Sequence, residues 1–241
     1  MPELDNLTSQ YTKGAVTEIE NELILNWYPD RILAKICNDK PNSLLALGIG
    51  HGFTTCKFSK FFKRHEVIEG SQKVIDMFKR EYPQNTSTIV HSFFEEYDSD
   101  EKFDIIIMGF ILEHVDDPEL ILKRFKKNLK EDGRIFVAVP NAKSLNRRLG
   151  MCLGKIDDIY SLNSNDKLLG HKRNFCIETL VECVENTGYN VIWREGVYLK
   201  PLPLEILKNL PDFKENLIAM CEVGKDYPEL SVSILLEISA N

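Results

Sequence analysis

Cysteine pairs are missing from this sequence. Its six cysteines are scattered along 241 residues, none of them in a C-x-x-C spacing, and no histidines stand at zinc-finger spacing. This pattern indicates neither a disulfide framework nor a zinc knuckle. Unpaired cysteines are typical of a reducing compartment, so we expect a cytoplasmic protein.

Long apolar runs are missing as well. No stretch of the sequence approaches the roughly 20 consecutive apolar residues that a membrane-spanning helix needs. The chain starts Met1-Pro-Glu-Leu-Asp-Asn, which is polar and acidic, whereas a secretory signal starts basic and continues apolar. We therefore expect neither export nor a membrane partner.

An excess of positive charge is also lacking. The formal net charge is −7 at pH 7, and the lysines and arginines are interspersed with acids. A surface that follows nucleic-acid phosphates requires the opposite balance, so we expect no nucleic-acid partner. The expected substrate is a small molecule, and the sequence leaves a homodimer open.

What the sequence does contain is a glycine turn between two apolar strands. Residues 43–53, Ser-Leu-Leu-Ala-Leu-Gly-Ile-Gly-His-Gly-Phe, indicate a buried strand, a turn and the start of a helix. Glu69 ends a second apolar strand about 20 residues after Gly48, the separation at which open α/β sheets bring an acid to a ribose. The sequence therefore predicts a cofactor that contains a nucleoside.

The spacing of the glycines favours one cofactor over another. A dinucleotide fingerprint needs a third glycine at position 53, where the chain has Phe53, and the glycines are Gly48, Gly50 and Gly52 instead. S-adenosylmethionine (SAM) has no pyrophosphate to seat on a helix N-terminus and needs only a turn free of side chains. SAM is the expected cofactor, and a nicotinamide dehydrogenase is the rival, which binding of NADH without SAM would favour.

Strand and helix patterns alternate along the rest of the chain. They predict one α/β domain over residues 1–241, a doubly wound, mostly parallel sheet of seven strands. Residues 1–40 form an expected helical cap, with helices on either side of Pro29, and residues 141–172 form an expected lid. Strands are expected at 44–47, 65–68, 86–90, 103–108, 134–139, 190–193 and 230–238, and helices at 53–62, 71–82, 117–129, 178–186 and 213–221.

Four stretches together resemble successive motifs of the class I SAM-dependent methyltransferases. These are Leu-Leu-Ala-Leu-Gly-Ile-Gly-His-Gly at 44–52, Val-Ile-Glu-Gly-Ser at 67–71, Phe-Asp-Ile-Ile-Ile-Met-Gly-Phe-Ile-Leu-Glu-His-Val-Asp-Asp-Pro at 103–118 and Val-Ala-Val-Pro-Asn at 137–141. The resemblance covers roughly residues 40–240 and is to the small-molecule type of this family, which implies a Rossmann-like fold and SAM as cofactor.

A narrower resemblance concerns the acceptor of the methyl group. The stretches at 140–150, 170–173 and 196–201 are similar to a bacterial subgroup associated with surface-polysaccharide pathways. This resemblance implies methyl transfer to oxygen or nitrogen of a small polar acceptor such as a sugar or a polysaccharide precursor. The alternative is a protein of the same fold that has lost turnover and serves as a binding or scaffold subunit.

The resemblance assigns roles around the methionine and the ribose of SAM. Gly48, Ile49 and Gly50 are expected under the methionine moiety. Glu69, with Gly70 behind it, is expected to accept hydrogen bonds from both ribose hydroxyls, since one carboxylate has two oxygens for two donors.

The resemblance also assigns roles to the next two strand ends. Phe93 or Phe94 supplies an apolar wall for the adenine, with packing in the core as an equally open reading. Met108 and Gly109 offer a backbone carbonyl to the cofactor's ammonium group. One departure stands out, because Ala46 replaces the acid that the family usually has two residues before the first glycine.

Three side chains are candidates for catalysis. His114 follows the fourth strand and His171 ends the lid, and an imidazole titrates near neutral pH, so either is a candidate base. Tyr11 precedes the first helix, where related enzymes close an N-terminal segment over SAM. A hydrogen bond to the backbone that caps the helix is the alternative for His114, and ordinary surface exposure is the alternative for His171.

Polar residues in and after the lid are candidates for binding the acceptor. They are Asn141, Arg147, Arg148 and Arg173. A turn role for Asn141 and ordinary surface exposure for the arginines are the alternatives.

No metal is expected. Glu113-His114 resembles part of the motif of metal-assisted ubiquinone-pathway O-methyltransferases, which needs another acid three residues earlier. This chain has Phe110 at that position, which leaves too few oxygen ligands.

Overall fold

The computed structural model describes residues 18–240. Its seven strands form one sheet in the order β3-β2-β1-β4-β5-β7-β6. The strands are β1 (Ser43–Leu47), β2 (Arg64–Glu69), β3 (Thr88–His91), β4 (Phe103–Gly109), β5 (Leu129–Pro140), β6 (Tyr189–Val197) and β7 (Ser233–Ala240). Strands β1 to β5 pair in parallel, whereas β7 lies antiparallel between β5 and β6. The predicted α/β fold with a mostly parallel seven-stranded sheet is confirmed.

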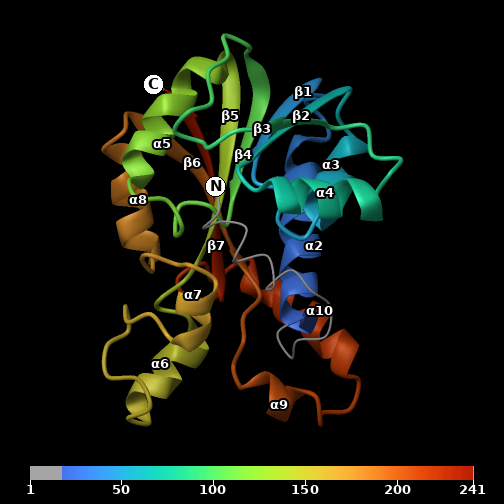
Figure 1. Ribbon diagram of the computed structural model, residues 1–241. Helices are drawn as coiled ribbons and strands as arrows, with labels where there is room; N and C mark the ends of the chain where they lie inside the picture. Colours follow the sequence, from blue (N-terminus) through green and yellow to red (C-terminus); the bar gives the residue numbers. More distant parts are fainter. Residues whose placement is uncertain (1–17, 241) are drawn as a thin grey trace.

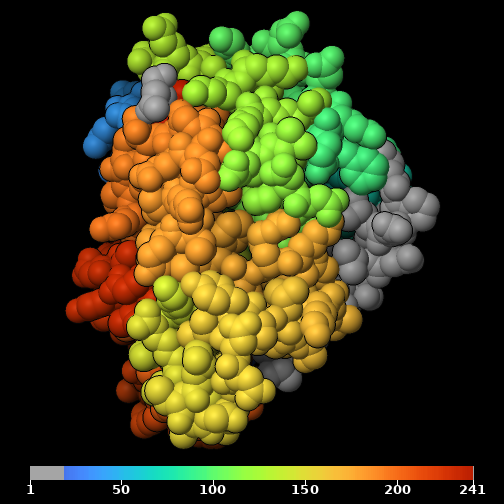
Figure 2. All heavy atoms as spheres, turned by 90° about the vertical axis from the view of Figure 1, so that its left-hand side faces the viewer, coloured from blue at the N-terminus to red at the C-terminus, as the bar shows by residue number. Residues whose placement is uncertain are grey.

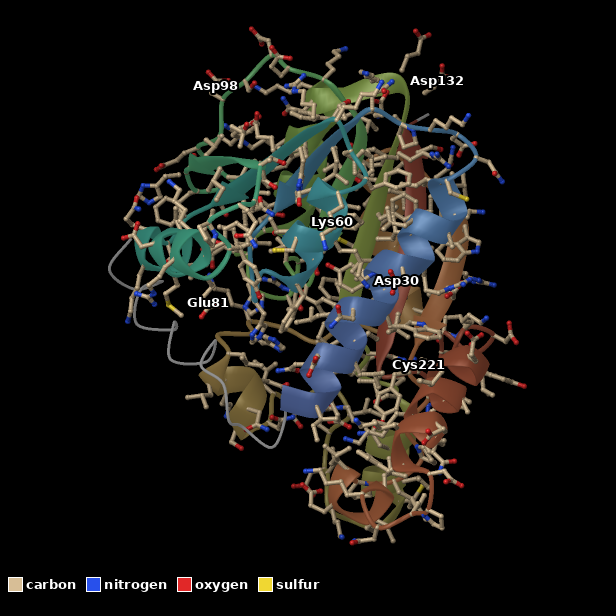
Figure 3. The ribbon with its side chains drawn as sticks, turned by 90° about the vertical axis from the view of Figure 1, so that its right-hand side faces the viewer. Asp30, Lys60, Glu81, Asp98, Asp132 and Cys221 are labelled. Atoms are coloured by element: carbon tan, nitrogen blue, oxygen red, sulfur yellow. The ribbon has the colours of Figure 1, made fainter. Side chains whose placement is uncertain are left out.

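Helices cover both faces of the sheet, as Figure 1 shows. One face packs against α2 (Glu18–Ile36), α3 (Phe53–Ser59), α4 (Gln72–Glu81) and α10 (Phe213–Gly224), and the other against α5 (Pro118–Phe125) and α8 (Ile177–Glu185). The face with α5 and α8 is turned toward the viewer in Figure 2, and α2 crosses the opposite face in Figure 3. Two apolar layers therefore bury the sheet, which explains why its central strands are continuous apolar runs.

The first helix corrects one prediction. Residues 18–36 form a single helix with Pro29 inside it, where two helices were expected. Proline has no N–H to donate to the carbonyl of Leu25, and that carbonyl instead accepts a hydrogen bond from the Thr54 hydroxyl at 3.3 Å. Lys57 donates to the neighbouring carbonyl of Asn26 at 2.9 Å. The helix continues through Pro29 because α3 supplies replacement donors.

The connection from α5 to β5 corrects a second prediction. Helix α5 begins at Pro118 with Asp117 as its N-cap, as predicted, but it ends at Phe125. A 3-10 turn at Lys126–Asn128 follows, and β5 begins at Leu129, so residues 130–133, which were expected between the helix and the strand, lie inside the strand. The pairing of β4 with β5 shifts register there, and this irregularity absorbs the turn residues.

The lid has more regular structure than its sequence indicates. It contains α6 (Leu145–Cys152) and α7 (Ser164–Leu168), and α9 (Leu204–Leu207) was also missed. All three lie beyond the end of the sheet where β5 leads into α6 (Figure 1). These helices are short and do not pack a long apolar face against the sheet. The spacing of their apolar residues therefore does not predict them from the sequence.

Buried His65 on β2 makes stability depend on pH. Burial lowers the pKa of His65 from 6.5 to about 4. Because the unfolded chain binds this proton more readily, stability that is present above pH 6.5 is lost as the pH falls toward 4, by up to about 3 kcal/mol.

We expect His65→Asn to remove this part of the pH dependence. Asparagine can keep the hydrogen bond that His65 Nδ1 shares with Ser87 Oγ at 2.8 Å. Urea unfolding at neutral pH and near pH 5 measures the difference. The same substitution at exposed His91 is the control, and an equal loss of stability in wild type and His65→Asn would contradict the prediction.

Candidate active site

The glycine turn after β1 has the predicted open conformation. Gly48, Gly50 and Gly52 have φ angles of +80°, +56° and +81°, a region that other residues rarely adopt. Among the described residues, no atom lies within 4 Å of a Cβ built at Gly50. The backbone at Gly50 therefore faces open space, as a cofactor that lies across it requires, whereas a Cβ at Gly48 would meet Ile111 at 3.0 Å and one at Gly52 would collide with Phe78 and Tyr82.

Glu69 is tied directly to this turn. One carboxylate oxygen accepts a hydrogen bond from the backbone N–H of Ile49 at 3.0 Å, and the other accepts from Ser71 N–H at 2.9 Å. Burial raises the pKa of Glu69, and the backbone hydrogen bonds counteract this. The backbone of Gly70 adds a third hydrogen bond. A carboxylate has about four acceptor positions, so Glu69 can still accept from a ribose hydroxyl, and the residues present fit an adenosine. Gly70 follows at the same strand end, with its carbonyl 3.2 Å from His91 Nε2.

Tyr28 of α2 reaches the end of β4, a contact that the sequence reasoning missed. Its side chain is buried, and its hydroxyl donates to Thr54 Oγ1 at 3.3 Å. A Cβ at Gly109 would collide with the Tyr28 hydroxyl, so glycine is required for this approach. The N-terminal helix thus forms one wall beside the strand end where the cofactor's ammonium group is expected.

Some of the other residues predicted to contact the cofactor are packed in the core, and others are available to a ligand. Met108 is fully buried in the core, so only its backbone is available to a ligand. Phe94 packs against the core on the α5 side, whereas Phe93 is half-buried and belongs to neither apolar cluster of the described residues. Ala46 is buried in the apolar cluster under α2, where an acid would be desolvated. The structure thus favours Phe93 over Phe94 as the adenine wall.

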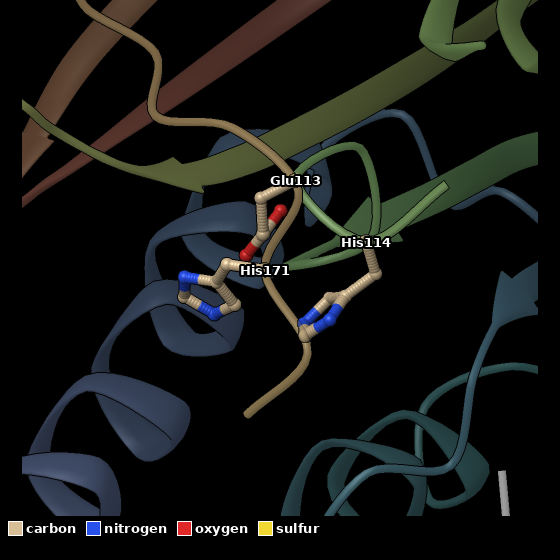
Figure 4. Close-up of side chains that lie close together, drawn as sticks. All are labelled: Glu113, His114 and His171. Atoms are coloured by element: carbon tan, nitrogen blue, oxygen red, sulfur yellow. The ribbon is translucent and has the colours of Figure 1, made fainter. Parts of the chain in front are cut away.

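The structure brings the two candidate histidines together. His114 lies in the loop after β4 and His171 in the segment that follows α7, and their rings meet edge to face with centroids 4.7 Å apart. Glu113, next to His114, completes a cluster in which one oxygen of Glu113 and one ring nitrogen of each histidine lie within 4.8 Å of one another (Figure 4). Sequence spacing gave no sign that Glu113 and His171 are neighbours.

Burial sets the charges in this cluster. It raises the pKa of Glu113 to about 8, and Arg173 counteracts it only in part. It lowers the pKa of His114 to about 4, with the nearby His171 adding to the effect, and it lowers the pKa of His171 as well. Burial therefore favours the uncharged forms of all three side chains while no ligand is bound.

Arg173 supports the loop that carries Glu113 and His114. Its guanidinium donates to the carbonyls of Leu112 at 2.9 Å and Asp116 at 2.8 Å, and also to the carbonyl of Val115. One side chain thus links the end of the lid to the whole turn after β4. This bracing accounts for Arg173 better than the predicted contact with an acceptor.

Three more predicted acceptor residues are engaged in other contacts. Asn141 is buried, donates to the carbonyls of Pro228 and Ser231, and accepts from Lys143 N–H. Arg147 holds the lid together through the carbonyls of Ile159 and Ser161 and an ion pair with Asp166 at 3.8 Å. Exposed Arg148 donates to the carbonyl of Lys143 at 2.7 Å. Tyr11 lies outside the described residues.

The sheet order, the glycine turn and the carboxylate tied to it define the class I SAM-dependent methyltransferases. A family profile described as a methyltransferase domain matches residues 21–193, more than half of the chain. The chain belongs to this methyltransferase family, and SAM is its cofactor.

Solved structures agree with this assignment at the level of the fold. A SAM-dependent methyltransferase of Thermotoga maritima is 17% identical, with a TM-score of 0.64 over 98% of this chain and 99% of that one. The methyltransferase in complex with the Trm112 methyltransferase activator of Haloferax volcanii is 13% identical, with a TM-score of 0.67 over 98% of each chain.

A third relative was solved with ligands. The 1,6-didemethyltoxoflavin-N1-methyltransferase of Burkholderia thailandensis, with 1,6-didemethyltoxoflavin and S-adenosylhomocysteine bound, is 14% identical, with a TM-score of 0.63 over 98% of this chain and 86% of that one. No match to a curated protein was found. Within residues 18–240, no helix combines the length and the apolar character that a membrane crossing needs.

Proposed function

We propose that this methyltransferase transfers the methyl group of SAM to an oxygen or nitrogen of a small polar acceptor, a sugar or a surface-polysaccharide precursor. The observation that carries the proposal is the meeting of the His114 and His171 rings, 4.7 Å apart, beyond the end of β4. Strand β4 pairs with β1, whose glycine turn is the expected methionine site, so the pair lies at the edge of the sheet where ligands bind.

Methyl transfer from SAM requires few catalytic side chains. SAM supplies a methyl group on a sulfonium, with a neutral thioether as leaving group. The chain has to hold the acceptor in line with that methyl and give its proton a destination. An uncharged imidazole of His114 or His171 can accept a hydrogen bond from an acceptor hydroxyl or amine.

The cofactor half of the proposal uses the first three strand ends. Gly48, Ile49 and Gly50 lie under the methionine, and Glu69, backed by Gly70, binds the ribose. The hydrogen bond from Ile49 N–H to Glu69 supports this, because it holds the carboxylate beside the bend.

The remaining contacts proposed for the cofactor are with its adenine and with its ammonium group. Half-buried Phe93 packs against the adenine, and the carbonyls of Met108 and Gly109 face the ammonium group. Tyr28 closes the site from α2, and Tyr11 is retained as a candidate at the entrance.

Several observations support a small acceptor. The loop after β4 reads Gly-Phe-Ile-Leu at 109–112, where nucleic-acid and amide methyltransferases carry an Asn/Asp-Pro-Pro-aromatic tetrad. The net charge of −7 also supports a small acceptor, because it disfavours a polyanionic substrate such as nucleic acid. The Burkholderia thailandensis relative binds a small molecule beside S-adenosylhomocysteine. The sugar itself rests on the similarity of the stretches at 140–150, 170–173 and 196–201 to a polysaccharide-pathway subgroup.

Calorimetry and an acceptor screen test this proposal. We expect purified protein to bind SAM and S-adenosylhomocysteine with one site per chain. Release of S-adenosylhomocysteine should then rise with free sugars, amino sugars or sugar nucleotides. His114→Asn and His171→Asn are expected to lower turnover about 100-fold or more while the Kd for SAM stays the same.

Two outcomes would contradict it. If SAM binds but no sugar compound stimulates release, the sugar acceptor is wrong and the methyltransferase assignment stands. If SAM does not bind to folded protein, the scaffold alternative takes its place.

A further inference from the structure

The cluster of Glu113, His114 and His171 contains polar atoms without partners. Glu113 is only 1% exposed, and within residues 18–240 neither of its carboxyl oxygens has a hydrogen-bond partner. In the same part of the chain, Nδ1 of His171 has no partner within hydrogen-bond distance either, and Asp166 Oδ1 lies 3.6 Å from it. A buried polar group left unpaired costs about 1–3 kcal/mol, so the Glu113 carboxyl beside two imidazoles requires an explanation.

We propose that Glu113, His114 and His171 bind one divalent transition-metal ion of the Zn²⁺ or Fe²⁺ type. Two imidazoles and one carboxylate are a donor set that these ions take in proteins, with positions left open for other ligands. Mg²⁺ and Ca²⁺ prefer oxygen ligands and are not expected. Figure 4 shows the Glu113 carboxylate directed toward the ring of His171.

Neighbouring groups orient the two rings. The carbonyl of Gly170 accepts a hydrogen bond from the His114 ring. Asp166 Oδ1 lies 3.6 Å from Nδ1 of His171, which leaves Nε2 of that ring for the ion. Asp166 is itself fixed by a capping box with Asn163 at the start of α7. Carbonyls and carboxylates behind metal-binding histidines are the usual supports of such sites.

The three ligand atoms have to move closer together to bind one ion. The three ligand atoms lie within 4.8 Å of one another, whereas bonds of about 2.1 Å to one ion bring ligand atoms to roughly 3–3.5 Å. His171 and Gly170 belong to the segment after α7, and Glu113 and His114 to the loop after β4. The two segments are already joined, since Lys172 N–H donates to the Glu113 carbonyl at 2.8 Å, so rotation of the three side chains would close the remaining gap.

This inference rests on the proposed function and specifies how the acceptor is activated. An acceptor hydroxyl oxygen at an open position of the ion loses its proton more readily, and the proton passes to water. The oxygen then forms a bond to the methyl carbon as the carbon–sulfur bond breaks, and that electron pair stays on sulfur. The histidines then act as ligands, and no imidazole has to take the proton.

The inference departs from the metal independence predicted by the sequence. That prediction rested on Phe110, which occupies the place of a further acid in a related motif. The third proposed ligand is His171, which lies at the end of the lid, far from Phe110 in the sequence. A sequence motif within one loop cannot show this.

Metal binding can be measured without any acceptor. Protein stripped with a chelator is titrated with Zn²⁺ by calorimetry and with Co²⁺ by visible absorption, which reports coordination by the protein. We expect one ion per chain, an affinity more than about 100-fold lower in Glu113→Gln and His171→Asn, and about 10–100-fold lower in Asp166→Asn. Glu182→Gln, on the exposed side of α8, is the matched control and should bind like wild type.

Melting curves and SAM titrations of each stripped variant show whether it is folded. Folded wild type that takes up no Zn²⁺, or that binds it equally well after Glu113→Gln, would overturn the inference. So would turnover that is the same in stripped and Zn²⁺-loaded enzyme, and in that case the proposed function stands. If SAM binding is absent while Zn²⁺ binding follows the expected pattern, the proposed function fails and the metal site stands.

Discussion

Glu69→Gln is expected to weaken SAM binding by roughly 10–100-fold. The amide keeps one acceptor oxygen but loses the charge, and a hydrogen bond to a charged group contributes about 1.5–3 kcal/mol. Because burial raises the pKa of Glu69, wild-type affinity should also fall as the pH is lowered toward that raised value. Calorimetric titration with SAM at two pH values checks both effects.

Glu66→Gln on the same strand is the matched control. Glu66 accepts a hydrogen bond from the Tyr97 hydroxyl at 2.6 Å, which glutamine can also accept, and it has no assigned role at the cofactor. Its affinity for SAM should match wild type. A folded Glu69→Gln protein with unchanged affinity would remove Glu69 from the ribose site and with it the main support for the cofactor geometry.

Arg173→Lys is expected to lower turnover by about 100-fold with little change in the Kd for SAM. Lysine keeps the charge, but its single ammonium cannot reproduce the planar fork that donates to the carbonyls of Leu112, Val115 and Asp116. The loop that carries Glu113 and His114 should then lose its position, and displacement of a reacting group by about 1 Å costs roughly this factor. Steady-state kinetics and SAM calorimetry separate the two quantities.

Arg194→Lys, at an exposed position of β6, controls for the exchange of arginine for lysine. This substitution should leave the turnover and the Kd for SAM unchanged. An Arg173→Lys enzyme with wild-type turnover would show that the brace is not needed for catalysis. Equal losses in turnover and SAM affinity would point to a general loss of structure.

The contact between the glycine turn and Glu69 could be predicted because it is nearly local. Gly48, Gly50 and Glu69 belong to one strand–helix–strand unit, and such a unit places the second strand end beside the first turn with little freedom. The hydrogen bond from Ile49 N–H to the Glu69 carboxylate is the outcome. The helix starts expected at Ser71 and Asp117 are also local features, and both residues are the N-caps of their helices.

The acceptor half could not be predicted in this way. Glu113 and His114 come from the loop after β4, and His171 and Arg173 come from the end of the lid. No periodicity relates these segments, and their meeting depends on how the lid folds back onto the sheet. The sequence could not show that Asn141 and Arg147 bond within the fold, because their partners are mostly backbone carbonyls.

The amino-acid sequence by itself determined the fold class and the identity of the cofactor. Both depend on short-range patterns, a glycine turn and an acid one strand later, whose geometry the chain itself enforces. Only the tertiary structure decided that a buried carboxyl lies against two imidazoles. Those neighbours are distant in sequence, and packing of the lid against the strand ends brings them together.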